Sequence, residues 1–151
     1  MKKTIVLIFF TLIIGNCYSQ SEKVGLSDKV QLTYKDYLNL KLQILAAQMS
    51  SGSYIIIDIG RIDYPVSITI NEQSKILFEI EKRLDTELAP ETQKDIMEEG
   101  FVFVMTAISE LIRRDFKNLN FDYQNDIIGY WYYNRIVSPK AKWEKGKFVW
   151  L

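Results

Sequence analysis

The sequence predicts an α+β fold in which a mostly antiparallel sheet of about five to six strands packs against two helices. Two segments, 33–50 and 90–116, repeat apolar residues at three- and four-residue spacing, as amphipathic helices do. The segments 54–84 and 119–151 are rich in β-branched and aromatic residues, which favour strands. Helices and strands that occur in blocks, rather than in strict alternation, are typical of an α+β domain.

The first 19 residues have the three parts of a secretory signal peptide. Lys2 and Lys3 make its start basic, and Ile5–Ile14 is an apolar run. Cys17–Ser19 ends it with small side chains at the two positions that signal peptidase recognises. As a helix the apolar run is about 15 Å long, half of the ~30 Å hydrocarbon core of a membrane. We therefore expect cleavage before Gln20 and a periplasmic or secreted protein with no transmembrane span after cleavage.

A second interpretation of the same segment remains open. The residues Ile14-Gly15-Asn16-Cys17 resemble the lipobox of bacterial lipoproteins in their aliphatic residue, small residue and cysteine. They depart from it at Asn16, where a lipobox usually has glycine, alanine or serine. The alternative is therefore a lipoprotein anchored through Cys17.

Charge and composition exclude several classes of function. The chain has 19 basic and 19 acidic residues, and removal of Lys2 and Lys3 with the signal leaves 17 against 19, a net charge of −2. We therefore expect no nucleic-acid binding. The chain has no histidine and one cysteine, so it lacks the usual ligands of zinc, haem and iron–sulfur clusters and the usual catalytic triads. We expect no cofactor, no metal site and, once Cys17 is removed, no disulfide.

Residues 20–32 are polar, and we interpret them as a leader before a single α+β domain over residues 33–151. The domain begins with a helix at Thr33, because Thr33–Asp36 resembles a capping box with aspartate in place of glutamate. The helix ends near Ser50, where Gly52 can adopt a left-handed cap.

Two strands are expected next. Tyr54–Ile59 is apolar on both faces, which predicts a central strand. The chain turns at Asp63–Pro65. Val66–Ile70 then alternates apolar and polar residues, which predicts a strand with one wet face that ends at Asn71–Ser74.

The segment Lys75–Leu84 fits both a strand and a helix, and we expect a strand that becomes helical after Glu81. Pro90 is a good first helical residue, and an apolar stripe continues from it to about Phe116. This long helix and the first strand should form the main core. The residues expected there are Phe101, Val104, Ile108 and Leu111 of the helix and Ile55, Ile57 and Ile59 of the strand.

The last quarter of the chain returns to strand patterns. Apolar and polar residues alternate over Leu119–Gln124, which predicts a strand, and the run Ile127–Val137 predicts another. A turn at Ser138–Lys140 is followed by a hairpin with Lys145-Gly146 at its tip.

The strongest candidate site is the aromatic run in this quarter. In a strand Tyr130 and Tyr132 share one face, and Trp131 and Tyr133 share the other, so only one pair can line the core. The other pair could stack on sugar rings or bind a protein, because tyrosine and tryptophan combine contact area with a polar group. The alternative is that both faces are covered. Trp143 and Trp150 complete this candidate surface.

Carboxylates are the only common catalytic groups left, and the weak candidates are Asp58, Asp63 and Asp122. Asp58 interrupts the apolar run 54–59, and burial there would favour its protonated form, as a general acid requires. With a second carboxylate it could hydrolyse glycans of the envelope or the exterior. The alternative is a structural Asp58 that binds a backbone amide or an arginine.

Oxygen-bearing side chains at alternate positions over 118–126 suggest calcium, but the sixth and twelfth positions of an EF-hand, which require glycine and glutamate, hold Tyr123 and Gly129. We interpret this row as the wet face of a strand. The leading hypothesis is therefore a non-enzymatic, exported bacterial protein that binds an envelope protein or glycan through its C-terminal aromatic sheet. A carboxylate-dependent hydrolase is the alternative.

Overall fold

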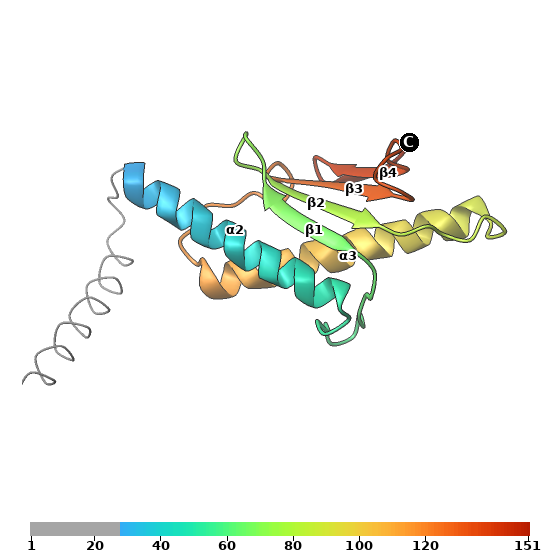
Figure 1. Cartoon of the computed structure of the whole chain (residues 1–151), viewed down its shortest axis with the longest axis horizontal. Coiled ribbons are helices and arrows are strands. Elements are labelled where there is room, and N and C mark those ends of the chain that lie inside the picture. The colour runs from blue at the N-terminus through green and yellow to red at the C-terminus, as the bar shows by residue number, and fades with distance from the viewer. Residues whose placement is uncertain (1–27) are drawn as a thin grey trace, which may run out of the picture. The chain divides into compact units, whose positions relative to one another are not determined.

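The computed structural model describes residues 28–151, and Leu38–Leu151 form one compact unit, to which the contacts below are confined. The fold is α+β, with a five-stranded, mostly antiparallel sheet and two helices, which confirms the predicted class. The expected signal peptide and residues 20–27 of the expected leader lie outside the described residues. The elements in chain order (Figure 1) are α2 (Asp28–Ser50), β1 (Val66–Ile70), β2 (Ile76–Glu81), α3 (Pro90–Asp115), β3 (Ile127–Tyr132), β4 (Ala141–Glu144) and β5 (Lys147–Trp150).

Helix α2 already includes Asp28, so the expected start at Thr33 is wrong. The segment 28–32 contains neither glycine nor proline, so it can also be helical. The capping-box sequence at Thr33–Asp36 therefore lies inside the helix and does not start it. The expected end is confirmed. The helix stops at Ser50, and Gly52 adopts a φ of 70° while its N–H bonds the Met49 carbonyl.

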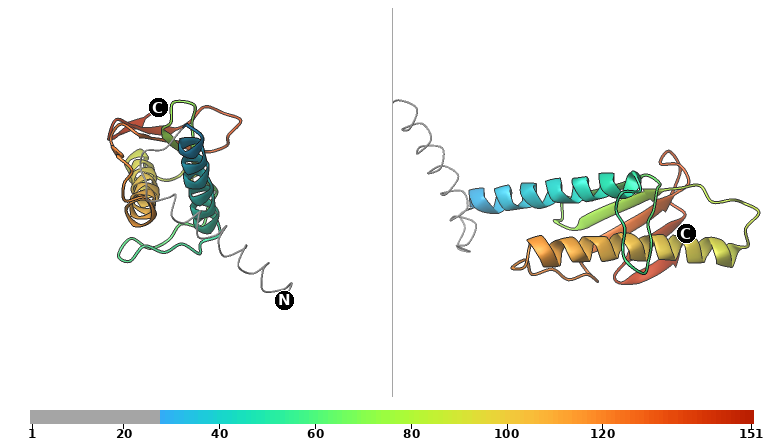
Figure 2. Two further views of the ribbon diagram at one scale, coloured as in Figure 1. Left: turned by 90° about the vertical axis from the view of Figure 1, so that its left-hand side faces the viewer. Right: turned by 90° about the horizontal axis from the view of Figure 1, so that it is seen from below.

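The strands follow one another across the sheet in the order β1-β2-β3-β4-β5. Every neighbouring pair is antiparallel except β2 and β3, which run parallel with Ile76 opposite Ile127 and Phe78 opposite Gly129. A parallel pair needs a crossover connection, and α3 supplies it. From Leu38 onward, both helices lie on the same side of the sheet (Figure 2).

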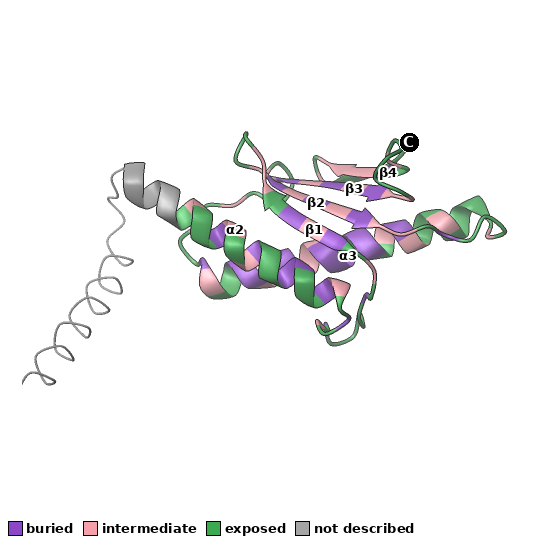
Figure 3. Cartoon of the chain, in the orientation of Figure 1, coloured by how far each residue is buried: buried purple, intermediate pink, exposed green. Residues whose placement is uncertain are grey.

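The main core lies between the sheet and the helices (Figure 3). Phe101, Val104, Ile108 and Leu111 of α3 are buried, as predicted. The Phe101 ring lies at the centre of an aromatic group, with ring centroids 5.5 Å from Phe78, 6.1 Å from Trp131 and 5.8 Å from Phe148. In the described residues no charged or polar side chain is buried in this core.

The expected central strand at Tyr54–Ile59 is wrong. This segment is a loop with a single bridge between Ile56 and Gly60, and its Ile55, Ile57 and Ile59 side chains are 66%, 85% and 49% exposed. Asp58 and Gly60 have φ values of 74° and 100°, so the backbone turns back before the run can extend. The β-branched composition therefore does not place these three isoleucines in the core.

Residues 82–84, which we expected to be helical, are not, and the chain stays non-helical up to Ala89 because local turns and Pro90 oppose a helix. The Asp85 carboxylate accepts the Glu87 N–H, and Ala89, which precedes the proline, is extended at φ −55° and ψ 144°. Leu84 is nevertheless buried. Pro90 begins α3, and Phe116 caps its end, as predicted.

The strand expected at Leu119–Gln124 is also absent. The Asp122 carboxylate accepts bonds from the Gln124 backbone N–H and the Asn125 side chain, while the Asp126 carboxylate accepts the Asp122 N–H. Such local bonds satisfy the backbone in a turn and compete with strand pairing. The alternating polar residues of 118–126 therefore belong to a loop.

The final hairpin is confirmed, although β3 is shorter than expected. β4 and β5 pair through a two-residue turn in which Lys145 and Gly146 have φ values of 53° and 70°, the conformation that hairpins favour. β3 ends at Tyr132 rather than Val137, and Ile136 is 90% exposed.

Candidate binding surface on the open face of the sheet

One face of the sheet carries no helix from Leu38 onward, and we call it the open face (Figure 2). Buried and half-buried residues alternate along β2 and β3, so each strand sends its even- and odd-numbered side chains to opposite faces. The open face is formed by Ser67 and Thr69 of β1, Leu77, Glu79 and Glu81 of β2, Ile128, Tyr130 and Tyr132 of β3, Lys142 and Glu144 of β4, and Lys147 and Val149 of β5.

Tyr130 and Tyr132 form the aromatic centre of the open face. Both are half-buried, and their ring centroids lie 6.2 Å apart with the planes inclined by 47°. The strand register places Glu79 beside Tyr130 and Glu81 beside Tyr132. Each ring therefore has a carboxylate as its immediate neighbour across the strands.

The other candidate aromatics have structural positions. Trp131 is fully buried, and its indole Nε1 donates to the Lys82 carbonyl oxygen at 2.8 Å. The Tyr133 hydroxyl donates to Gln93 Oε1 at 2.6 Å, and the ring packs against the core. Trp143 packs against the same core, and Trp150 is 43% exposed on β5. Of the six predicted aromatic site residues, the structure brings Tyr130 and Tyr132 together on the open face.

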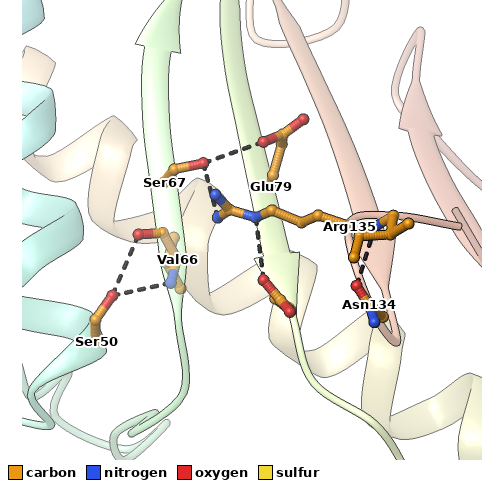
Figure 4. A network of polar contacts seen from close by, with 8 residues as sticks. Ser50, Val66, Ser67, Glu79, Asn134 and Arg135 are labelled. Atoms are coloured by element: carbon orange, nitrogen blue, oxygen red, sulfur yellow. Dashed lines mark hydrogen bonds and ion pairs between the residues drawn. The ribbon is translucent and has the colours of Figure 1, made fainter.

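A polar network crosses β1 and β2 beside the tyrosines (Figure 4). Arg135 extends back from the β3–β4 connection, with its Nε 3.2 Å from Glu81 Oε2 and its Nη2 3.3 Å from Ser67 Oγ. The Ser67 hydroxyl donates to Glu79 Oε2 at 3.3 Å. Asn134 Oδ1 accepts the Ile136 N–H and so shapes the turn that presents Arg135.

The opposite side of the tyrosine pair carries a second charged pair. Lys142 Nζ lies 2.6 Å from Glu144 Oε2 and 5.8 Å from the centroid of the Tyr130 ring. Burial, followed by the nearby Glu79 carboxylate, raises the pKa of Tyr132 above its ordinary value. The open face thus combines two aromatic rings with carboxylates, cations and hydroxyls.

The aromatic run was predicted from the sequence, whereas its charged neighbours in β2 and β4 were not. The signal is present in β2, where Ile76, Phe78 and Ile80 share one face and the glutamates necessarily share the other. Lys142 could not be placed, because its position beside Tyr130 depends on the register of β3 with β4.

The three candidate catalytic carboxylates lie elsewhere and apart from the open face. Asp58 is exposed in the loop 53–62, so the buried environment expected for a general acid is absent. Asp63 is exposed as well, and Asp122 holds together the turn at 122–126. Within residues 28–151 no group of three or more acidic, cysteine or histidine side chains is arranged to hold a metal ion.

No family model, curated protein or solved structure matches this chain. Neither helix in the described part of the chain has an apolar stretch sufficient to cross a membrane.

Proposed function

We propose that this chain is a non-enzymatic, exported bacterial protein that binds an envelope glycan through the open face. The observation that carries the proposal is the pair of tyrosine rings on a sheet face that carries no helix within Leu38–Leu151. The proposed export rests on the basic, apolar and small-residue order of residues 1–19.

The chemistry of the open face favours a sugar over a protein as the ligand. Aromatic faces stack on the C–H groups of pyranose rings, and carboxylates and guanidinium groups hydrogen-bond to the surrounding hydroxyls. Glu79, Glu81 and Arg135 supply such groups beside the two tyrosines.

The ion pairs already present on the open face do not prevent sugar binding. Arg135–Glu81 and Lys142–Glu144 are exposed or half-exposed pairs, and such surface pairs contribute little to stability. Their carboxylates retain oxygen lone pairs that can accept further hydrogen bonds. The pairs hold the charged groups in place around the rings.

The experiment is a screen of the purified protein against immobilised envelope polysaccharides, beside a crosslinking pull-down from native envelopes. We expect retention on a glycan that Tyr130→Ala/Tyr132→Ala abolishes and that Tyr123→Ala preserves. Tyr123 is a matched control, because it is 39% exposed and lies outside the open face. Crosslinking to a protein alone, or equal glycan binding by the double variant, would overturn the proposal.

The exported form has its own test. Intact mass and N-terminal sequencing of the protein from the expressing cells should give a chain that begins at Gln20. A diacylglyceryl group on Cys17 in the membrane fraction would instead establish the lipoprotein alternative.

A further inference from the structure

A second surface, independent of the open face, lies between α3 and the loop 53–62. It is an open groove of about 510 Å³, which we call the acidic groove. Ile62 and Phe103 are buried at its base, while Ile59 and Val102 line it and are 49% and 40% exposed. Ile57, two residues before Ile59 in the chain, is also exposed.

The exposed aliphatic side chains at the acidic groove indicate an interaction site. Single exposed apolar residues are normal on a protein surface, but contiguous apolar patches mark interaction sites. Ile57 is 85% exposed at the tip of the loop, and its burial in a complex would remove apolar area from water. The loop contributes three exposed isoleucines, of which Ile59 lines the acidic groove.

Charge defines which partner the acidic groove fits. Asp58, Glu98 and Glu99 line it, against the cation Arg61. Tyr64 also lines the groove; burial first, and then the carboxylates of Asp63 and Glu99, raise the pKa of its phenol to about 12. A second cation, Lys82, lies beside this ring, with its Nζ 4.4 Å from the ring centroid. Anionic lipid headgroups would be repelled by this arrangement, whereas lysine and arginine side chains would be attracted.

We propose that the acidic groove docks a basic, extended segment of a partner protein, with an aliphatic side chain of that segment on Ile59 and Val102 and its cationic side chains on Asp58, Glu98 and Glu99. The match between apolar floor and acidic rim resembles the pattern of groove recognition, in which apolar anchors give affinity and rim charges give specificity. This site does not depend on the glycan-binding function of the open face.

The test uses purified protein and two synthetic peptides, one of alternating lysine and leucine and one of alternating glutamate and leucine. We expect the basic peptide to bind and to shift the amide resonances of residues 57–62 and 98–103, with affinity that falls as salt is raised. The acidic peptide should not bind. Binding of the basic peptide at the open face, or no binding, would overturn the proposal.

Variants separate the acidic groove from nonspecific charge attraction. Glu98→Gln/Glu99→Gln should lower the affinity for the basic peptide about fivefold, because two partly exposed charge contacts are lost. The control Glu87→Gln/Glu91→Gln removes the same charge from two exposed positions, one in the turn before α3 and one in its first turn, and should bind normally. Tyr130→Ala/Tyr132→Ala should also bind normally, so failure here and failure of the glycan proposal are distinguishable.

Two further outcomes would overturn the choice of occupant. Adsorption to phosphatidylcholine vesicles that Ile57→Ser abolishes, without peptide binding, would assign the loop to a lipid surface. Concentration-dependent self-association that Glu98→Gln/Glu99→Gln abolishes would assign the acidic groove to a second copy of the chain.

Discussion

Gly129→Ala is the most specific test of the sheet register. Gly129 lies in β3 opposite Phe78 of β2, and a methyl group added to it would lie 2.2 Å from Cζ of the Phe78 ring and 2.7 Å from both Cε atoms. Phe78 is fully buried, and its ring packs edge-on against Phe101. The ring is therefore enclosed by other residues of the core.

The expected cost follows from this geometry. Carbon atoms pack at about 3.5–4.0 Å, so the Phe78 ring must move by more than ~1 Å or the two strands must separate. Overpacking of a core costs about 1–3 kcal/mol. We expect the upper part of this range, about 3 kcal/mol, because the contact involves three ring atoms. For a chain of this size the melting temperature should fall by roughly 6–12 °C.

The assay is urea unfolding followed by circular dichroism, with Phe78→Leu as the partner substitution. Leucine lacks the three ring atoms that clash, so Gly129→Ala should cost less in a Phe78→Leu background, with a coupling of about 1–2 kcal/mol. Strict additivity, or a neutral Gly129→Ala, would show that these residues do not face each other. The parallel pairing of β2 with β3 would then be wrong.

Other predictions test the core, the loop and the tyrosines. Because Ile108 is fully buried, Ile108→Ala should lower the free energy of unfolding by about 2–5 kcal/mol, and Ile108→Asp should leave the protein unfolded. Ile57→Ser, at an exposed position, should change the free energy of unfolding by less than ~0.5 kcal/mol. Urea titrations in which Ile57→Ser costs more than Ile108→Ala would contradict the core assignment. Trp131→Phe should cost at least about 1 kcal/mol by the same assay, because it removes the hydrogen bond to the Lys82 carbonyl, and a neutral result would exclude that bond. Burial, then Glu110, raises the pKa of Tyr54 to about 12, and burial raises that of Tyr64 to about 12. An unfolded tyrosine ionises near pH ~10, so this stabilisation is complete below that pH and is lost as the pH rises through about 12. The free energy of unfolding should therefore be lower at pH 11.5 than at pH 9, and this difference should be smaller in Tyr54→Phe/Tyr64→Phe. An equal difference in the variant would contradict the raised pKa of these two tyrosines.

The elements predicted from sequence with most success are those with a strong local signal. The stripe of α3 begins at a proline and continues for seven turns, so packing and propensity agree. The β4–β5 hairpin has a turn with glycine at its second position, which favours one geometry. Apolar and polar residues alternate over Val66–Ile70, as expected of a strand with one buried and one solvent-exposed face.

The segment Tyr54–Ile59 could not be placed correctly from sequence. A run of isoleucines has the same composition whether it pairs in a sheet or is exposed in a loop, and the decision depends on whether a partner strand is available. Here β1 takes β2 as its neighbour, while on the other edge Ser50 and Asn39 of α2 bond the Val66 and Ile70 backbone groups. The loop therefore has no place in the sheet.

Only part of the open face could be predicted from the sequence, for a related reason. Alternation correctly pairs Tyr130 with Tyr132 and separates both from Trp131, because period two is a local property of a strand. Which pair is buried depends on the side on which the helices pack. Arg135 joins Glu81 and Ser67 across two strands, and this arrangement follows from the parallel β2–β3 pairing, which no local pattern indicates.

Hydroxyl-radical footprinting with and without the glycan retained in the screen tests most directly whether the open face is the binding surface. Mass spectrometry reads the modification of each tyrosine separately. The account predicts that the glycan protects Tyr130 and Tyr132 while Tyr123, exposed and outside the open face, is modified equally in both samples. Protection of Tyr123 alone, or unchanged modification of Tyr130 and Tyr132 at saturating glycan, would contradict it.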